Sequence, residues 1–388
     1  MPKKFKIALG LLAFLLLAFG INGVAILAQG DEYMHIATVR QSLDNNSWLL
    51  PTLEGLPNYY KPPILFWIGM LSEALLGNSL FAVRLPAVLA GLGSIFLLYR
   101  LLKVTGAPAL FPSIAYALSL GTLKFSKLLM MEQFMAFALL VTTLFFVRFV
   151  QTKSYRCLLW AGLASAIAYF FKGPLFQVYT GFLFLAWAIP LFLHFNAQGD
   201  FRGWHRVPTI LKAALVLHLP LLLPLAWNGW LFYSAPDNYG KAILEFFYVN
   251  ENLSKFRHAD QSPFMIPMGW LLYSAPWTVM IIGAFFLALR STVRDSRVRI
   301  GRMLFVTALA ISLLHMLPSR KDPYYVIPVL PVLFAGLPMI LYSSRNEIGC
   351  ADRISRWMKA NFVFSAFVAL IAFIAALILR LPWYWVLA

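Results

Sequence analysis

Apolar runs of about 20 residues recur along almost the whole chain and alternate with short polar or charged segments. A helix of that length crosses the hydrocarbon layer of a bilayer and satisfies its own backbone hydrogen bonds there. The alternating pattern of a membrane barrel does not occur in the sequence. The runs predict an all-α polytopic membrane protein with eleven transmembrane helices, at residues 7–28, 82–102, 107–123, 128–150, 157–171, 175–194, 209–230, 264–289, 303–317, 324–342 and 360–379.

Two of the predicted connections are long enough to contain structure of their own. They are residues 29–81, which follow the first predicted span, and residues 231–263. Within the first connection, the segment from Glu32 to Leu43 has apolar residues at helical spacing, which predicts an interfacial helix. We therefore predict a single integral membrane domain over residues 1–388, without a soluble C-terminal domain.

Composition and charge agree with this interpretation. The chain is 61% hydrophobic and 12% charged, whereas soluble domains have about a quarter charged residues. The formal net charge of +17 does not indicate nucleic-acid binding, because the basic residues are spread over the ends of the predicted spans. They favour one side, which places the N-terminus inside and both long connections outside.

Other features of the sequence bear on processing and redox chemistry. The first apolar run, 7–28, is longer than a usual signal-peptide core, so it predicts an uncleaved first span. The two cysteines, Cys157 and Cys350, fall near predicted inner helix ends and show no metal-type spacing. A disulfide framework is therefore not expected.

Charged residues gather on the predicted outer side of the spans, where a purely structural protein does not need them. A charge near the middle of a bilayer costs on the order of 3 kcal/mol. Glu132, about one turn inside its predicted span, is therefore expected to face an interior cavity or a basic partner. The other members of this group are Asp31, Glu32, Lys61, Lys172, Arg320, Lys321 and Asp322.

Structural roles are open for several of these residues. Asp31 and Glu32 can form the cap of a helix, because acidic residues stabilise a helix N-terminus. Glu132 can anchor a helix end by extending its carboxylate toward water. His35 and His258 are more often solvated or hydrogen-bonded than bound to a metal.

Together these residue types predict group transfer from a phosphate. A carboxylate such as Asp31, Glu32 or Glu132 can act as a base toward a hydroxyl. Cations can hold a phosphate and stabilise it as a leaving group, and the candidates are Lys61, Lys172, Arg257 and Lys321. A divalent cation is a candidate cofactor, and its potential ligands are Asp31, Glu32, His35, Glu132 and His258.

An ordered series of short motifs, over roughly residues 20–335, resembles the GT-C membrane glycosyltransferases. The similar branch holds bacterial aminoarabinose transferases and protein O-mannosyltransferase-like enzymes. The motifs are Asp31-Glu32, Trp48-Leu49-Leu50-Pro51, Glu54-Gly55, Tyr60-Lys61-Pro62-Pro63, Phe66-Trp67, Arg84-Leu85-Pro86, Phe171-Lys172-Gly173-Pro174, Glu251-Asn252-Leu253, Pro276-Trp277, and Lys321 followed by Pro323-Tyr324-Tyr325 and Pro328.

The resemblance implies a fold of many helices with short interfacial helices in the first long connection. It also implies inverting transfer of a sugar from a polyprenyl-phosphate donor, at the outer face of a bacterial inner membrane. The implied acceptor is lipid A, another envelope glycan or a protein. Asp31 takes the position of the family's catalytic carboxylate, and Lys61 and Lys172 match lysines expected near the donor phosphate. Further site candidates are His35, Tyr60, His258, Tyr324 and Tyr325.

The chain departs from the family pattern at two of these positions. His35 stands where the family often has Tyr, and Glu132 is the nearest match to an Asp at the start of the fourth span. The alternative function is a transporter or flippase of lipid-linked sugars. A transporter predicts charges spread through the membrane depth or paired broken helices, whereas these charges crowd one side.

Overall fold

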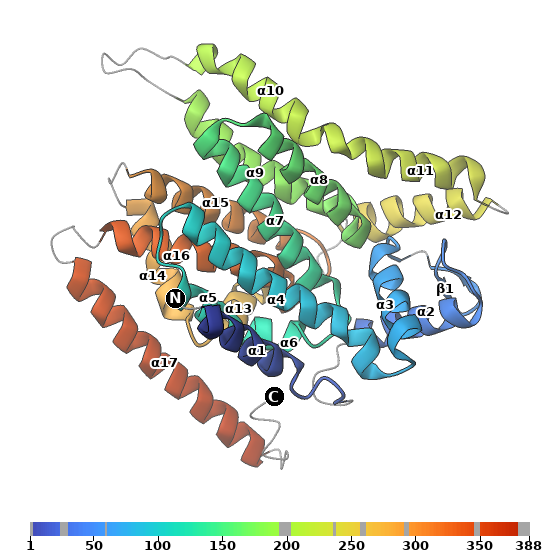
Figure 1. The fold of residues 1–388 in the computed structure, drawn as a ribbon, viewed down its shortest axis with the longest axis horizontal. Coiled ribbons are helices and arrows are strands. Elements are labelled where there is room, and N and C mark those ends of the chain that lie inside the picture. Colours follow the sequence, from blue (N-terminus) through green and yellow to red (C-terminus); the bar gives the residue numbers. More distant parts are fainter. Residues whose placement is uncertain are drawn as a thin grey trace.

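The computed structural model describes residues 3–23, 30–58, 60–193, 203–235, 238–256, 261–290, 295–344 and 350–378. These residues form a helical bundle with a two-stranded hairpin at one end (Figure 1). The inner helices and turns of the bundle are α4 (Leu80–Val104), α5 (Leu110–Ala117), α6 (Leu120–Phe125), α7 (Met131–Thr152), α8 (Tyr155–Lys172), α9 (Leu175–Phe192), α13 (Met265–Tyr273), α14 (Thr278–Arg290), α15 (Ser296–His315), η6 (Pro323–Val329) and α16 (Leu330–Ser344).

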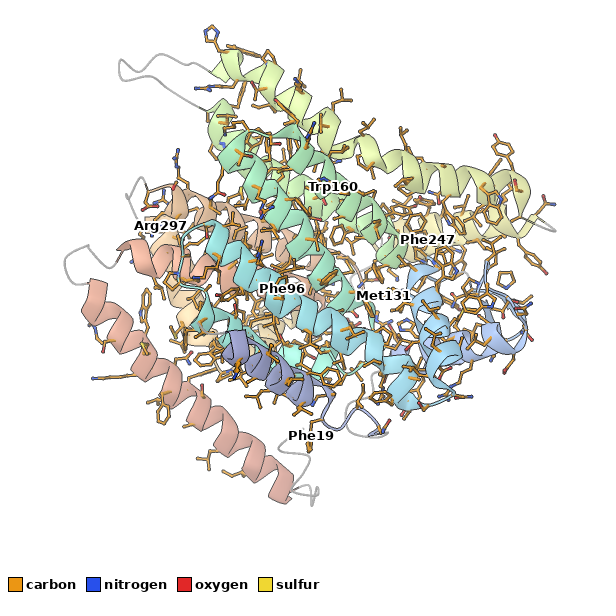
Figure 2. All side chains as sticks on the ribbon, in the orientation of Figure 1. Phe19, Phe96, Met131, Trp160, Phe247 and Arg297 are labelled. Atoms are coloured by element: carbon orange, nitrogen blue, oxygen red, sulfur yellow. The ribbon has the colours of Figure 1, made fainter. Side chains whose placement is uncertain are left out.

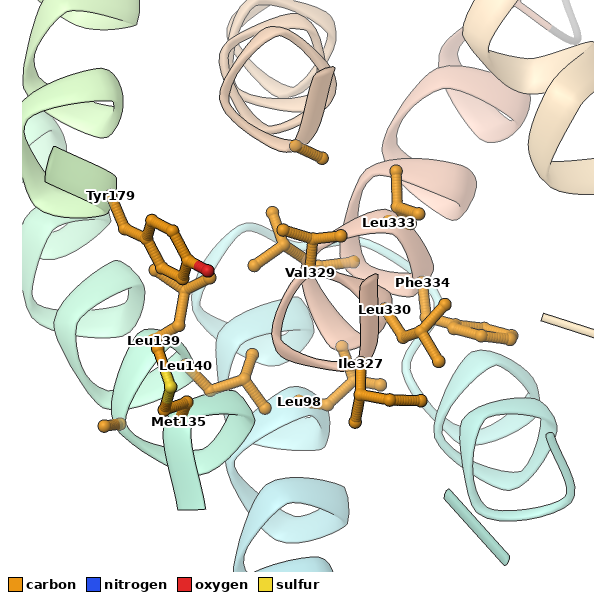
Figure 3. Packing of buried hydrophobic residues seen from close by; sticks show 14 of the residues in the cluster. Leu98, Met135, Leu139, Leu140, Tyr179, Ile327, Val329, Leu330, Leu333 and Phe334 are labelled. Carbon is orange, nitrogen blue, oxygen red and sulfur yellow. The ribbon is translucent and has the colours of Figure 1, made fainter. Parts of the chain in front are cut away.

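The core lies where α4 and α7 meet η6 and α16. Figure 3 shows Leu98 of α4 and Leu140 of α7 near Ile327 and Val329, and all four side chains are buried. An apolar stretch of 18 residues in α7 is 72% buried, and the corresponding stretch in residues 323–341 is 89% buried. These segments are therefore central. Closely packed interiors deform little, so the ends of α4 and α7 are held in place.

Other helices lie at the periphery and expose apolar side chains. Within residues 203–234, an apolar stretch of 18 residues is only 17% buried, as expected for a surface that faces lipid. This segment runs along one side of the bundle in Figure 1. The peripheral elements are α1 (Lys3–Ala18), η1 (Gly203–Arg206), α10 (Val207–His218), η2 (Leu219–Leu221), α11 (Leu222–Ser234) and α17 (Cys350–Ile378).

The predicted fold class, an all-α polytopic membrane protein, is confirmed, but the count of eleven spans is not. Six helices among the described residues are long and apolar enough to cross a membrane, or seven if one bent pair counts as a span. That pair is α13 and α14, which meet at an angle of 116° within the predicted span 264–289.

The predicted span 107–123 is also broken, into α5 and α6. Ser119 lies at the break and donates a hydrogen bond from Oγ to the carbonyl of Tyr116, at 2.8 Å. The next amide, Leu120 N, donates to Ala275 O of the α13–α14 connection, at 2.9 Å. Local side-chain bonding and a distant carbonyl thus replace the helical bonds. Hydrophobic length alone does not reveal such a break.

The two long connections meet at one end of the bundle, which we call the loop end. The first contributes α2 (Gly30–Asp44), the strands β1 (Thr52–Leu53) and β2 (Leu56–Pro57), and α3 (Ile64–Leu76). The second contributes α12 (Tyr239–Glu245), the π-helical segment η4 (Phe246–Leu253) and η5 (Ser254–Phe256). Figure 1 shows α2, α3 and α12 together at this end.

The predicted interfacial helix is present as α2, and the hairpin after it follows from its turn residues. Glu54 and Gly55 have positive φ angles of 55° and 78°, the conformation that joins two strands through a two-residue turn. The apolar helix α3 agrees with the further short helices that the family resemblance implies for this connection, although no residue range was predicted for it. Its 13 residues are too few to cross a bilayer alone, and it packs on α2.

Candidate active site at the loop end

Glu32 and Arg84 form a buried ion pair that fixes the start of α2. Arg84 donates from Nε and Nη2 to the two Glu32 carboxylate oxygens, each at 2.7 Å. Arg84 Nη1 also donates to Ile21 O and Gly23 O, and Leu129 N donates to Glu32 Oε1 at 2.9 Å. This arrangement ties α2 to α4 and to the turn before α7.

Both carboxylate oxygens of Glu32 are therefore occupied, and the side chain is only 1% exposed. A bidentate guanidinium fixes the orientation of the carboxylate. The geometry favours a positioning role for Glu32 rather than the catalytic role predicted from the sequence. Asp31, its neighbour in the first turn of α2, is the carboxylate that reaches solvent.

Asp31 lies next to the turn that precedes η6, although 289 positions separate the two segments. Arg320 Nη2 lies 3.4 Å from Asp31 Oδ1, while Arg320 Nε lies 2.7 Å from Asp322 Oδ2. Tyr324 donates its hydroxyl proton to Asp322 Oδ2 at 3.0 Å. The Asp31 side chain is 31% exposed, so it can receive a proton from an arriving hydroxyl.

His35, one turn after Asp31 on α2, is buried with a defined hydrogen bond. Its Nδ1 lies 2.9 Å from Leu129 O, so this nitrogen carries the proton and donates it. Burial lowers the pKa of His35 to about 4, with Lys61 adding to the effect. The imidazole is therefore neutral at physiological pH.

Lys61 shares a carboxylate with a second lysine of the other long connection. Glu251 Oε2 lies 3.7 Å from Lys61 Nζ and 2.7 Å from Lys255 Nζ. Burial and the nearby charge of Lys172 lower the pKa of Lys61 to about 8. Lys61 and Lys172 are close enough to repel each other, so together they form a site that favours a bound anion.

Lys172 ends α8 beside Lys61 and is paired with Glu132. Its ammonium donates to Glu132 Oε1 at 3.0 Å and lies 4.5 Å above the centre of the Tyr325 ring. Gly173 follows with a φ of 64°, and a Cβ there would lie 2.3 Å from the Phe247 ring. The glycine therefore lets α8 end directly against η4.

The remaining predicted residues are distributed around this centre. Tyr60 is 42% exposed and its ring contacts Phe246 of η4 edge-on at 5.3 Å. Lys321 is 1% exposed, and its ammonium donates to Ser319 O at 3.4 Å. Arg257 and His258 lie outside the described residues.

A crevice opens beside Lys61, between α3, α8, α11 and the second long connection. Asn228 of α11 and Tyr169 of α8 contribute polar groups to its lining, and Asn228 donates to the hydroxyls of Tyr169 and Tyr248 at 2.8 and 2.7 Å. Figure 2 shows Phe247 at this end of the bundle. The rest of the lining is largely apolar and includes Leu50, Pro51, Pro62, Phe66, Trp227, Leu231, Ile243, Leu244 and Phe247.

Several side chains that build the candidate site were not among the predicted site residues. Arg84 and Glu251 occurred only as members of motifs, and Arg320 only as one of the outer-side charges. The sequence carried a usable signal for Glu251, because it lies four residues before Lys255 on one turn of helix. The partners of Arg84 and Arg320 lie too far along the chain for spacing to reveal them.

No group of three or more His, Cys, Asp or Glu side chains that could hold a metal ion occurs within the described ranges. Of the proposed ligands, Glu32 has both oxygens engaged by Arg84, and His258 lies outside those ranges. The divalent cation stays a prediction, and no step below depends on it.

Comparison with known proteins identifies the relatives of this chain. The family model of dolichyl-phosphate-mannose-protein mannosyltransferases matches residues 60–227. The chain is 25% identical, over 97% of its length, to undecaprenyl phosphate-alpha-4-amino-4-deoxy-L-arabinose arabinosyl transferase 2 of Proteus mirabilis. It is 26% identical, over 94% of its length, to the corresponding transferase of Pseudomonas savastanoi pv. phaseolicola. It spans 65% and 66% of those two proteins.

Solved structures show the same fold. The structure of ArnT from Cupriavidus metallidurans bound to undecaprenyl phosphate matches 98% of this chain with a TM-score of 0.72 and 16% sequence identity. The match covers 66% of that ArnT chain. The Archaeoglobus fulgidus oligosaccharyltransferase matches 95% of this chain and 54% of its own, with a TM-score of 0.52 and 14% identity.

The fold is therefore that of the GT-C membrane proteins. Within this class, the resemblance to the aminoarabinose transferase and protein O-mannosyltransferase-like family, predicted from the motifs, is confirmed.

Proposed function

We propose that the protein is an inverting glycosyltransferase that moves a sugar from a polyprenyl-phosphate donor to an acceptor hydroxyl. The observation that carries the proposal is the convergence of Lys61 and Lys172 beside a crevice with largely apolar walls. A lipid phosphate needs both features, since its head is anionic and its tail is apolar. The names of the relatives, which include undecaprenyl phosphate, support this donor class.

The donor phosphate is assigned to Lys61 and Lys172. Each lysine has one carboxylate partner, Glu251 and Glu132 respectively. An ammonium has three hydrogens to donate, so each lysine retains capacity to donate to phosphate oxygens. Preorganised cations at the leaving group stabilise the charge that develops on it during transfer. The isoprenoid tail would follow the crevice and contact Phe66 and Trp227.

Asp31 is assigned to the acceptor. Its carboxylate would accept the proton of the acceptor hydroxyl while that oxygen forms a bond to the anomeric carbon. The bond between this carbon and the phosphate oxygen breaks, and polyprenyl phosphate leaves from the opposite face of the sugar with the bonding electrons. Configuration inverts because the single displacement occurs from the side opposite the leaving group.

The surroundings of Asp31 support this role. Arg320 orients the carboxylate and is in turn shared with Asp322. The lysines that would hold the phosphate come from the end of α8 and the segment before α3, whereas Arg320 comes from the turn before η6. The two reactants would thus be held by different elements.

We place the site at the outer face of a bacterial inner membrane, with lipid A, another envelope glycan or a protein as acceptor. The arrangement of basic residues along the sequence supports this orientation. Fusing a periplasm-active reporter enzyme within residues 231–263 measures it. If a second reporter enzyme, one that works only in the cytoplasm, is active at this position instead, the site faces the cytoplasm and the assignment is wrong.

A proteoliposome assay separates transfer from transport. Purified protein is reconstituted with undecaprenyl phosphate-linked 4-amino-4-deoxy-L-arabinose on one leaflet and lipid A as acceptor, and products are measured by mass spectrometry. We expect glycosylated lipid A and free undecaprenyl phosphate in equal amounts. Movement of intact donor between leaflets, with no product from this or other lipid-linked pentoses, would instead establish the flippase.

A further inference from the structure

His35 lies one turn after Asp31 on α2 and has a buried ring nitrogen that meets no hydrogen-bond partner in the described part of the chain. Its Nδ1 donates to Leu129 O at 2.9 Å, which leaves Nε2 as a bare lone pair that can only accept a hydrogen bond. Nε2 has no hydrogen-bond partner among the described residues, and the side chain is 2% exposed. A buried polar atom of this kind requires a ligand or solvent partner, because leaving it unpaired is unfavourable.

Glu132 presents a second buried acceptor. Its Oε1 accepts a hydrogen bond from the ammonium of Lys172 at 3.0 Å. Its Oε2 has no hydrogen-bond partner among the described residues, and the residue is 3% exposed. Oε1 is thus bonded to Lys172, whereas Oε2 can accept a hydrogen bond from a ligand.

The two acceptors belong to one constellation. The carbonyl that fixes His35 belongs to Leu129, and Glu132 lies three residues further on, in the first turn of α7. The charges that act on His35 are those of Lys61, Glu132 and Asp31. His35 is therefore close both to the lysine assigned to the phosphate and to the carboxylate assigned to the acceptor hydroxyl.

Two other buried hydroxyls do not share this setting. Those of Thr142 and Thr143 also have no hydrogen-bond partner among the described residues, but they lie in the middle of α7, about three turns beyond Glu132. A Thr hydroxyl can rotate to find a backbone carbonyl, whereas the His35 ring is fixed by its bond to Leu129.

We propose that His35 Nε2 and Glu132 Oε2 form the subsite that binds the sugar of the donor. Both atoms are acceptors, so the ligand must present two hydrogen-bond donors, either hydroxyls or an amino group. A phosphate is excluded from this position because it offers only acceptors. This inference rests on the proposed function and adds to it the residues that recognise the transferred group.

The subsite also defines substrate specificity. Sites built to pair with a hydroxyl or amino group discriminate strongly against analogues that lack it, since the buried partner is then left unpaired. We therefore expect a sugar that lacks one of the two matching groups to bind about 5- to 10-fold more weakly, the equivalent of one hydrogen bond.

Three substitutions of His35 separate recognition from structure. His35→Asn can keep the hydrogen bond to Leu129 O but has no acceptor at the Nε2 position. His35→Gln can place an oxygen acceptor at that position. His35→Phe has neither the donor to Leu129 O nor the acceptor. Glu132→Gln tests the second acceptor, because its amide can bond Lys172 through oxygen and turn its NH2 group toward the sugar.

The measurement compares two ligands on purified protein in detergent. Dissociation constants are obtained for undecaprenyl methyl phosphate and for undecaprenyl phosphate-linked 4-amino-4-deoxy-L-arabinose, and their ratio is the readout. Because both ligands are phosphate diesters with one negative charge and the same tail, effects of a variant on Lys61 or Lys172 cancel in the ratio.

We expect wild type to prefer the sugar-bearing lipid, and His35→Asn, His35→Phe and Glu132→Gln each to lose about 5- to 10-fold of that preference. His35→Gln should retain more of it than His35→Asn. An unchanged ratio in these variants, or equal weakening for both lipids, would overturn the subsite. If wild type binds neither lipid, the proposed function itself fails, which is a different result.

Discussion

At the scale of single residues, the site is built from charges that are held in place by other charges. Glu32 is bound by Arg84, Glu132 by Lys172 and Glu251 by Lys255, with the shared atoms 2.7 to 3.0 Å apart. Such pairs are costly to bury, and breaking one leaves an uncompensated charge. Asp31 and Lys61 have the longest contacts of the group, at 3.4 and 3.7 Å, which suits groups that exchange partners when substrate arrives.

The Lys61 ammonium predicts how donor binding depends on pH. With a pKa of about 8 in the free protein, Lys61 is protonated below pH 8 and loses its charge as the pH rises through that value. The affinity for undecaprenyl phosphate should therefore fall about tenfold between pH 7.5 and pH 9.5. Binding titrations across this range measure it.

Lys61→Arg is the matched control for this prediction. Arginine stays charged throughout the range, so the decrease should disappear even if the affinity itself changes. An identical decrease in wild type and in Lys61→Arg would show that another group is titrating.

The buried pair of Glu32 and Arg84 makes a stability prediction. Arg84→Met leaves the Glu32 carboxylate without its bidentate partner in a site where both residues are at most 2% exposed. The free energy of unfolding should fall by about 3–5 kcal/mol. Denaturation in detergent monitored by tryptophan fluorescence measures the change.

The double variant Arg84→Met with Glu32→Gln provides the contrast. Removing both charges relieves the uncompensated carboxylate, so the double variant should be more stable than Arg84→Met alone. Additive losses would argue against the pair as the anchor of α2.

At the scale of elements, the two long connections cooperate through η4. Phe246 of η4 contacts Tyr60, Phe247 packs against Gly173, and Glu251 bridges Lys61 and Lys255. The π-helical form of η4 is rare in proteins and is often found at functional sites. This segment thus lines the crevice and supplies Glu251, the carboxylate that pairs with Lys61, to which we assign the donor phosphate.

Removing that carboxylate should strengthen donor binding. The phosphate of the donor competes with Glu251 for Lys61, so Glu251→Gln is expected to lower the dissociation constant of undecaprenyl phosphate by about 5-fold or more. Glu245→Gln, at an exposed position of the same connection, should leave it unchanged. Weaker binding in Glu251→Gln would mean that the carboxylate orients the lysines instead.

Much of this end of the molecule could be predicted from the sequence, and the remainder has a clear physical origin. The period of apolar residues predicted α2, and the order of the motifs predicted which charges to consider. Pairs such as Asp31 with Arg320 depend on how distant helices pack, and no local pattern encodes that. The breaks at Ser119 and between α13 and α14 likewise depend on bonds and packing between segments.

At the scale of the whole molecule, the residues with proposed roles lie at one end of the described bundle, and the other elements hold that end in place. Central helices such as α7 carry site residues at their ends, while α10, α11 and α17 lie at the periphery of the bundle. The chain covers about two thirds of the relatives that it matches. The part shared with them includes every residue to which the proposed reaction assigns a role.

The most direct test of the proposed function compares transfer by wild type and Asp31→Asn. Both proteins receive undecaprenyl phosphate-linked 4-amino-4-deoxy-L-arabinose and lipid A, and glycosylated product is followed over time while binding of undecaprenyl phosphate is measured in parallel. We predict that Asp31→Asn binds the lipid normally but transfers at least about 100-fold more slowly, the usual contribution of a positioned base. Transfer by Asp31→Asn within a few-fold of wild type would contradict the assignment of the reaction to this site.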